Sequence, residues 1–328
     1  MRAAWYERTG LAAEVLQVGE MPKPEPGPGD VLVRVKASGI NPADVKRRAG
    51  WGGMAMDHQR VIPHCDGAGA IEAVGKGVPP ERIGSRVWLW NAQGGYGAVG
   101  RADGTAAEWI ALPAEQAVPL PAALSFDAGA CLGVPAMTAH RTVFADGPVT
   151  GQTILVQGGA GAVGHFAVQM ARLGGARVLA TVGSAEGAAH AEAAGAEPIL
   201  RRQTDVAAAV MAATGGCGVD RIVEVDFAAN AAVDAPVLVP NGTIASFSST
   251  SNPAPVLPYY SFAAKGLNLR FIQGFALPPA ARGAAHAFIA MHATALNVAI
   301  RGLHDLFDIA KAHESVEKGG IGNVVLRL

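Results

Sequence analysis

Thr153-Ile154-Leu155-Val156-Gln157-Gly158-Gly159-Ala160-Gly161-Ala162-Val163-Gly164 is the stretch that decides the fold. An apolar run leads directly into closely spaced glycines, and residues of helical periodicity follow. Gly159 suits a tight turn, Gly161 lets the backbone approach a pyrophosphate, and Gly164 lets the helix pack close to the strand. The start of that helix directs free N–H groups and the positive dipole end at the anion. The predicted phosphate contacts are Gly158, Gly159, Ala160, Gly161, Ala162, Val163 and Gly164.

The chain contains 42 glycines, so the loop alone does not distinguish a nucleotide site from a glycine-rich turn without a ligand. The residues after the loop decide between these two. A second strand is predicted over 177–182, and Gly174-Gly175 ends the intervening helix. Strand-like and alanine-rich helical stretches then alternate as far as about residue 261. Such alternation is typical of a doubly wound parallel sheet. The further predicted strands are 197–200, 221–225 and 243–247.

The two ends of the chain have a different texture. Residues 1 to about 111 show short strand-like runs, such as 31–35 and 86–90, between Pro and Gly clusters. These features predict a turn-rich β domain. After the alternating region we predict an edge strand over 267–272, helices around 279–299 and 304–317, and a final strand over 323–328.

Composition limits the classes of function. Apolar residues make up 50% of the 328 residues and charged residues 16%, which indicates a globular protein with substantial cores. The net charge of -1 gives no general attraction to nucleic acid or to an anionic membrane. No apolar run approaches a bilayer span, and charged residues stand near the N-terminus where a secretory signal needs an apolar core. We therefore expect a cytoplasmic protein without a nucleic-acid or membrane partner.

Several ordered motifs carry a family resemblance. They are Ala37–Asp44 with Arg48-Ala49-Gly50, Ile62–Gly69 running to Val74-Gly75, Gly133–Ala139, and the glycine loop. The chain resembles zinc-independent medium-chain dehydrogenases/reductases, and most closely the NADPH:quinone oxidoreductases related to zeta-crystallin. The resemblance implies an α/β fold with a GroES-like β-rich catalytic domain over 1–124 and a Rossmann domain over 125–261. Residues 262–328 would complete the catalytic domain.

The metal separates two enzymatic alternatives. Zinc alcohol dehydrogenases of this superfamily have Cys at the position of Asn41 and His at that of Cys65. A catalytic zinc needs three protein ligands, and Cys65 with Asp66 supplies at most two, because His64 faces away in an extended segment. Without a Lewis acid, hydride transfer to a quinone or an α,β-unsaturated carbonyl stays feasible. We predict this metal-free reduction. A zinc-dependent alcohol dehydrogenase-like enzyme and a non-catalytic NADPH-binding or redox-sensing protein are the alternatives.

Three residues are predicted to be catalytic. The resemblance places Asn41 beside the nicotinamide, with an amide that can donate to a substrate oxygen, although Asn41-Pro42 is also a common turn. Asp44 either orients the cofactor or caps a helix. Lys46 stands where many relatives have Tyr and could donate to the developing oxyanion, but Lys46-Arg47-Arg48 is also typical of a solvated face.

Loop residues are candidates for a substrate pocket, namely Trp51, Met54, Met56 and the segment 90–96, which ends at Tyr96. Hydrophobic loop residues also commonly pack under their own loop.

Cofactor choice is predicted from the end of the second Rossmann strand. An NAD site favours Asp or Glu there, whereas residues 181–184 are neutral and end at the small Ser184. Arg201 or Arg202 could bind a 2′-phosphate with a bidentate guanidinium, although adjacent arginines also occur as surface pairs. We therefore predict NADPH. The resemblance adds cofactor contacts at Thr138, Phe247, Ser248, Ser249, Phe271 and Asn323.

Two further expectations concern the rest of the chain. Relatives form homodimers by pairing edge strands of their Rossmann sheets, and residues 267–272 suit that role. His286, His292, His304 and His313 are predicted to be surface or capping residues.

Overall fold

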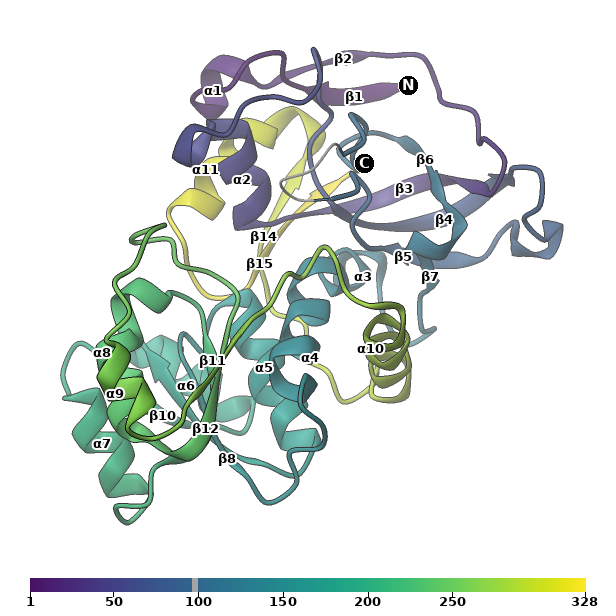
Figure 1. Ribbon diagram of the computed structural model, residues 1–328. Coiled ribbons are helices and arrows are strands. Elements are labelled where there is room, and N and C mark those ends of the chain that lie inside the picture. Colours follow the sequence, from purple (N-terminus) through teal and green to yellow (C-terminus); the bar gives the residue numbers. More distant parts are fainter. Residues whose placement is uncertain (96–99) are drawn as a thin grey trace. The chain divides into compact units, whose positions relative to one another are not determined.

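The computed structural model describes residues 1–95 and 100–328, which form two compact units (Figure 1). The first unit combines Met1–Pro135 with Arg282–Leu328, and the second is Ala136–Ala281. These limits differ from the predicted boundaries at 124/125 and 261/262. The helix α3 (Phe126–Gly129) contacts strands of the first unit, and β13 (Asn268–Phe271) pairs within the sheet of the second.

The second unit is built on a parallel sheet with strand order β10-β9-β8-β11-β12-β13, which confirms the predicted doubly wound fold. Figure 1 shows α4 and α5 on one side of this sheet and α7, α8 and α9 on the other. The other strands are β8 (Thr153–Val156), β9 (Arg177–Val182), β10 (Glu197–Leu200), β11 (Val219–Glu224) and β12 (Leu238–Ser246). The helices are α4 (Met137–Phe144), α5 (Ala162–Leu173), α6 (Ala185–Ala193), α7 (Val206–Ala213), α8 (Phe227–Val237) and α9 (Tyr259–Ala263).

Local sequence explains these elements. The central strands β8 and β11 are almost entirely buried, as expected for a parallel sheet covered on both faces. Ser184 caps α6 by accepting a hydrogen bond from the Gly187 N–H, and Asp205 caps α7 in the same way. Burial of the strands between two helical layers thus fixes the sheet and places its carboxyl-end loops along one edge.

The first unit contains a mixed sheet with strand order β14-β15-β3-β4-β5-β7, and β6 pairs with β3. Its strands are β3 (Asp30–Ile40), β4 (Asp66–Val74), β5 (Arg86–Leu89), β6 (Trp109–Pro113), β7 (Ala117–Pro119), β14 (Ile300–Asp305) and β15 (Asn323–Arg327), and β1 (Arg2–Trp5) pairs with β2 (Gln17–Glu20). Its helices include α1 (Ala12–Val15), α2 (Pro42–Ala49) and α11 (Ile309–Glu317). Because β15 pairs antiparallel with β3, the C-terminal segment completes this sheet.

The region after residue 279 differs from the sequence-based prediction. The helix α10 (Pro279–Met291) ends well before the predicted residue 299, and the predicted helix over 304–317 begins only at Ile309. Residues 300–305 instead form β14, which pairs in parallel with β15. Pairing with a strand distant in sequence therefore overrides the local helical pattern. In the part of the chain that the structure describes, no helix is long and apolar enough to cross a membrane.

Candidate functional site

The glycine loop of the second unit lies between β8 and α5, as the sequence predicts. Gly158 has φ 72°, a left-handed conformation that suits glycine. A Cβ at Gly159 would lie 2.6 Å from the Ala180 Cβ, and one at Gly164 would overlap the Gly158 carbonyl oxygen. Gly161 is the N-cap residue of α5, and no side chain caps this helix. The result is a backbone cradle at a helix N-terminus, which fits the pyrophosphate of a dinucleotide.

The loop is held by Thr181 of the neighbouring strand β9. The Gly158 N–H donates to Thr181 Oγ1 at 3.0 Å, and the Gly159 N–H donates to the Thr181 carbonyl oxygen at 3.0 Å. The Thr181 hydroxyl in turn donates to Gln157 Oε1 at 2.7 Å. One buried residue thus fixes both glycines that begin the cradle, Gly158 through its side chain and Gly159 through its backbone.

The end of β9 brings two of the predicted cofactor residues together. Ser184 is exposed at the start of α6, and the Arg201 N–H donates to the Val182 carbonyl oxygen at 3.0 Å. The Arg201 guanidinium flanks Gly183, since a Cβ on Gly183 would lie 3.9 Å from Arg201 Nε. Arg202 is exposed on the same turn. Residues 181–185 carry no acidic side chain, and Glu186 follows in the first turn of α6.

The other predicted cofactor residues of the second unit occupy loops or buried positions. Ser249 Oγ accepts a hydrogen bond from the Ala228 N–H at 3.2 Å, and Phe247 and Ser248 are half-buried after β12. Thr138 is buried in α4, and Phe271 at the end of β13 is 75% exposed. Three of these residues therefore follow the carboxyl end of β12.

Predicted and additional residues form a buried polar cluster in the first unit. Asn41 donates its backbone N–H to Asp44 Oδ2 and its amide Nδ2–H to Asp66 Oδ2, each at 2.7 Å. The Val134 N–H also donates to Asp66 Oδ2 at 2.7 Å. Asp44 thus acts as the helix-capping residue of α2, which was one of its two predicted roles. From the sequence, Asp66 was considered only as a possible metal ligand. Its role as the acceptor at the centre of this cluster was not predicted.

Burial controls the charge of the two cluster carboxyls. Loss of hydration raises the pKa of Asp44 to about 6, partly offset by the hydrogen bond from Asn41. Burial also raises the pKa of Asp66 well above its usual value, and the nearby Asp44 adds to this effect. Burial therefore favours the neutral form of Asp66, which accepts hydrogen bonds without a buried negative charge.

The alternative that Lys46-Arg47-Arg48 forms a solvated face does not hold for Arg48. Arg48 is completely buried, pairs with Glu317 of α11 and donates to the Gly10 carbonyl oxygen. Lys46 lies over the Trp51 ring, with its Nζ 4.7 Å from the ring centroid. Each cation has a specific partner that is distant in sequence or comes from a loop, so local charge pattern alone could not identify it.

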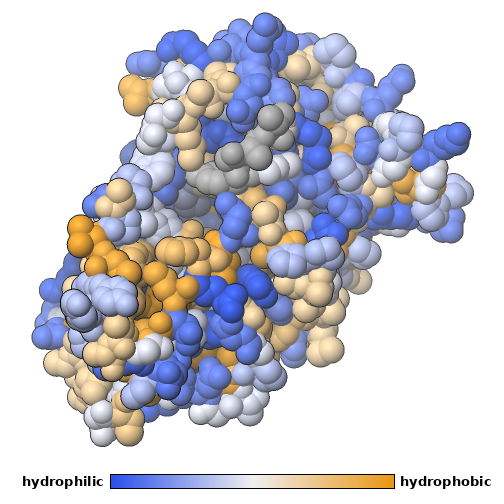
Figure 2. All heavy atoms as spheres, viewed as in Figure 1, coloured by the Kyte–Doolittle hydropathy of each residue, from blue (hydrophilic) through white to orange (hydrophobic). Residues whose placement is uncertain are grey.

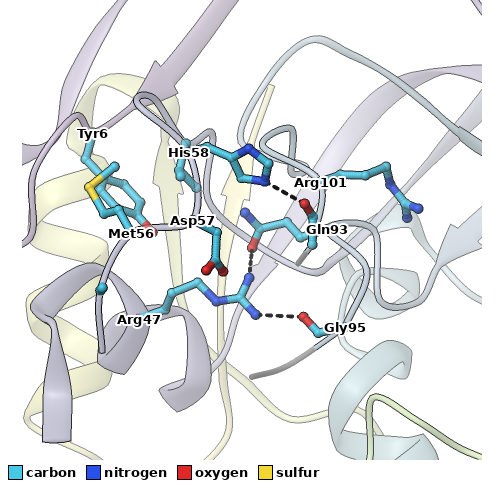
Figure 3. A pocket seen from close by; sticks show the side chains of 11 residues that line it. Tyr6, Arg47, Met56, Asp57, His58, Gln93, Gly95 and Arg101 are labelled. Atoms are coloured by element: carbon cyan, nitrogen blue, oxygen red, sulfur yellow. Dashed lines mark hydrogen bonds between the residues drawn. The ribbon is translucent and has the colours of Figure 1, made fainter. Parts of the chain in front are cut away.

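A pocket of the first unit surrounds Arg47 (Figure 3). Arg47 donates to Gln93 Oε1 at 2.9 Å and to the Gly95 carbonyl oxygen at 3.2 Å, and the Asp57 side chain points toward the same space. Of the predicted substrate-pocket residues, Met56 lines this pocket, Trp51 and Met54 are not among its described walls, and Tyr96 lies outside the described residues. The described walls are Tyr6, Arg47, Ala55, Met56, Asp57, His58, Val61, Gln93, Gly95, Gly100 and Arg101.

The donor set around Cys65 does not fit a catalytic metal. Among residues 1–95 and 100–328, no group of three or more His, Cys, Asp or Glu side chains is placed to hold a metal ion. Cys65 is buried, and its Sγ lies 3.6 Å from Gln93 Oε1. His64 belongs to a different network, with Nδ1 2.8 Å from Ser38 Oγ and Nε2 2.9 Å from His313 Nε2.

The last of these contacts corrects the prediction for His313. This residue is completely buried in α11 rather than on the surface. Burial lowers the pKa of His64 to about 3 and that of His313 well below its usual value, so both rings are neutral. Two neutral imidazoles can share one Nε2–H···Nε2 hydrogen bond, which ties α11 to the start of β4.

Comparisons with known proteins agree with the geometry of both units. Residues 27–122 match the alcohol dehydrogenase GroES-like domain, and residues 162–290 match the zinc-binding dehydrogenase domain. The chain is 30% identical to a quinone oxidoreductase of Lama guanicoe over 343 residues, covering 100% of this chain and 98% of that protein. A quinone oxidoreductase of Rattus norvegicus is 33% identical over 218 residues, which span 64% of this chain but only 62% of the rat protein.

Solved structures extend the similarity over the whole chain. A quinone oxidoreductase of Pseudomonas syringae has a TM-score of 0.86 at 28% identity and covers 100% of this chain and 99% of that one. A native mycobacterial structure complexed with NADPH has a TM-score of 0.86 at 29% identity and covers 100% of both chains.

Proposed function

The chain belongs to the medium-chain dehydrogenase/reductase family, and on this premise we propose that it transfers hydride from NADPH to a quinone or an α,β-unsaturated carbonyl without a metal ion. Its similarity to quinone oxidoreductases supports the general assignment as an NAD(P)-dependent oxidoreductase with a nicotinamide cofactor and a small-molecule substrate. The observation that carries the proposal is the glycine cradle between β8 and α5, where a Cβ at either Gly159 or Gly164 would meet other atoms.

The chain's own residues have distinct proposed tasks. The reduced nicotinamide, when bound, supplies the hydride. The backbone from Gly158 to Gly164 would hold the pyrophosphate, because its N–H groups border the positive end of α5. Phe247, Ser248 and Ser249 stay proposed contacts on the loop after β12. The remaining proposed contacts are Thr138, Phe271 and Asn323, although the Asn323 amide already donates to the Ala299 carbonyl oxygen at 2.9 Å.

The polar cluster of the first unit would serve the acceptor. Hydride addition to a conjugated carbonyl creates an enolate-type or phenolate-type anion, which hydrogen-bond donors stabilise. One N–H of the Asn41 amide is held by Asp66, so this contact fixes the amide and leaves its second N–H as the proposed donor. Lys46 is a second proposed donor. Overall, acceptor, NADPH and one proton would give the two-electron-reduced acceptor and NADP⁺.

Turnover with a defined set of acceptors tests this proposal. We expect purified protein to oxidise NADPH when 1,4-benzoquinone, 9,10-phenanthrenequinone or cyclohexenone is added. NADPH binding measured in parallel separates the alternatives. Tight binding without reduction of any acceptor would favour the non-catalytic, redox-sensing function, and oxidation of alcohols only after addition of zinc would favour the zinc enzyme.

Arg201 is proposed to select NADPH over NADH. Its guanidinium flanks Gly183 at the end of β9, where the adenosine ribose of a Rossmann-bound cofactor is recognised. Loss of a charged, bidentate phosphate contact costs about 1.5–3 kcal/mol. Arg201→Ala should therefore lower the NADPH/NADH ratio of kcat/KM roughly 10- to 100-fold. Arg202→Ala removes the neighbouring cation and shows whether the effect belongs to Arg201 or to positive charge on this turn in general. An unchanged ratio in both variants and in the double variant would exclude this assignment.

We also propose a homodimer formed through β13. This strand pairs with β12 at the end of the sheet order, and exposed hydrophobic residues lie on and near it, including Val256, Tyr260 and Phe271 at 87%, 84% and 75% exposure. Figure 2 shows hydrophobic atoms on the visible face of the second unit beside α8 and α9. Light scattering should report a dimer, and Phe271→Lys should shift it toward the monomer, because the new charge would be desolvated at the interface. A monomeric wild-type protein at working concentration would contradict this proposal.

The predicted cytoplasmic location stays a prediction.

A further inference from the structure

Two buried acids meet beneath the glycine loop of the second unit. Glu224 is the last residue of β11 and Asp234 lies in α8, and both side chains are completely buried. Their carboxyl groups are in hydrogen-bond contact with one another. Glu224 Oε2 and Asp234 Oδ2 have no donor among the described residues. Two ionised carboxylates would repel each other and leave both oxygens unsatisfied, whereas one shared proton supplies the missing donor.

The Asp234 side of the pair leads to the cofactor loop. Asp234 Oδ1 accepts a hydrogen bond from Gln157 Nε2 at 2.7 Å, and Gln157 Oε1 accepts one from the Thr181 hydroxyl at 2.7 Å. Thr181 Oγ1 then accepts the Gly158 N–H at 3.0 Å. In this arrangement each group donates toward Asp234, and Asp234 Oδ1 is the final acceptor. The Thr181 hydroxyl oxygen could also accept from a rotated Gln157 amide, so an acceptor at Asp234 Oδ1 is what selects this orientation of the chain.

The Glu224 side leads to the loop after β11. Glu224 Oε1 accepts hydrogen bonds from the Asp226 N–H and from Asn230 Nδ2, the latter at 2.9 Å. Asp226 is the charged group that faces the pair from the start of α8, and its carboxylate accepts a hydrogen bond from the Ser251 hydroxyl at 2.8 Å. Gln157, just after β8, and Thr181 on β9 are the neutral groups that face the pair. The negative charge of Asp226 favours retention of the proton by Glu224.

We propose that Glu224 and Asp234 are a proton-sharing pair of positioning residues for the nicotinamide cofactor. Asp234 reaches the glycine loop only through Gln157 and Thr181. The shared proton holds Gln157 and Thr181 in one orientation, and these hold the Gly158 N–H and thereby the shape of the cradle. This role rests on the proposed function in so far as the glycine loop binds the cofactor.

Amide substitutions test the shared proton directly. In Glu224→Gln, the amide oxygen can still accept from Asp226 and Asn230, and the amide N–H can donate to Asp234. In Asp234→Asn, the oxygen can still accept from Gln157, and the N–H can donate to Glu224. Each single variant should therefore keep the KM for NADPH within about 3-fold of wild type. The double variant places two NH₂ groups against each other and should raise that KM roughly 10-fold or more, with kcat at saturating NADPH nearly unchanged.

The pH profile provides a readout that a simple packing role would not change. Burial raises the pKa of both acids, and the charge of Glu224 adds to the effect on Asp234. The pair's stabilising effect is thus present at low pH and is lost as pH rises through deprotonation in the folded protein. The affinity of wild-type protein for NADPH should fall at alkaline pH. Both single variants should show a flatter profile, because an amide keeps its N–H.

The possible results separate failure of the pair from failure of the proposed function. Single variants with the wild-type alkaline decline, or a double variant that binds NADPH as tightly as the singles, would overturn the shared proton. A wild-type protein that does not bind NADPH at any pH would overturn the proposed function and the positioning role together. If the double variant does not fold, the single-variant pH profiles decide the question.

Discussion

Replacing Gly164 with alanine is expected to lower the affinity for NADPH by at least about 100-fold, which corresponds to roughly 3 kcal/mol. The new Cβ would overlap the Gly158 carbonyl oxygen and lie 3.0 Å from the Gly159 Cα. Both neighbours are backbone atoms, so the cradle itself must open to relieve the overlap. NADPH titration by nicotinamide fluorescence or calorimetry measures the loss.

Two other glycines provide matched controls for this prediction. At Gly161 the new Cβ would be 3.4 Å from the Gly158 carbonyl oxygen, so Gly161→Ala should keep the fold and reduce affinity only by obstructing the pyrophosphate. At Gly283, in α10, a Cβ would meet nothing within 4 Å, so Gly283→Ala should leave NADPH affinity unchanged. Wild-type affinity in Gly164→Ala would show that the cofactor does not bind across this loop.

Replacing Asp66 with alanine is expected to lower the free energy of unfolding by about 3 kcal/mol and to reduce kcat strongly. The Asn41 amide and the Val134 N–H would both lose their acceptor in a buried site. The Asn41 amide would then also lose the contact that fixes its direction. Denaturant unfolding gives the change in stability, and NADPH oxidation with a quinone gives the change in kcat.

The asparagine variant at the same position separates acceptor geometry from charge. Burial raises the pKa of Asp66 well above its usual value, which favours a neutral side chain that acts as an acceptor. Asp66→Asn keeps such an acceptor and should cost only about 1 kcal/mol. The raised pKa also means that the wild-type contribution is lost as pH rises through the folded-state value, and asparagine should remove this dependence. Equal losses in the alanine and asparagine variants would contradict a neutral, hydrogen-bond-accepting Asp66.

The glycine cradle and the parallel sheet could be predicted because their causes are local. Glycine spacing, strand length and alternation of elements are all visible along the chain, and β9 and β10 occupy the predicted ranges. By contrast, β14 depends on pairing with β15, so the local pattern suggested a helix instead. Tertiary pairing decided that element.

The missed site residues share one property, which is a partner that the sequence does not indicate. Arg48 was considered only as part of a charge run that is typical of a solvated face, yet its partner Glu317 lies near the end of the chain. Glu224 was seen only as part of a predicted strand, and Asp234 as part of a helical stretch. An acid directly after the apolar pair Ile222-Val223 was the available signal for Glu224, but the contact with Asp234 needs the packing of α8 on β11.

Turnover by metal-free protein tests the central proposal most directly. Purified protein is treated with a strong chelator, its zinc content is measured by elemental analysis, and NADPH oxidation is followed with 9,10-phenanthrenequinone. We expect full NADPH-oxidising activity with far less than one zinc ion per chain, and no increase in activity when zinc is added. Activity that disappears with the metal and returns in proportion to bound zinc would contradict it.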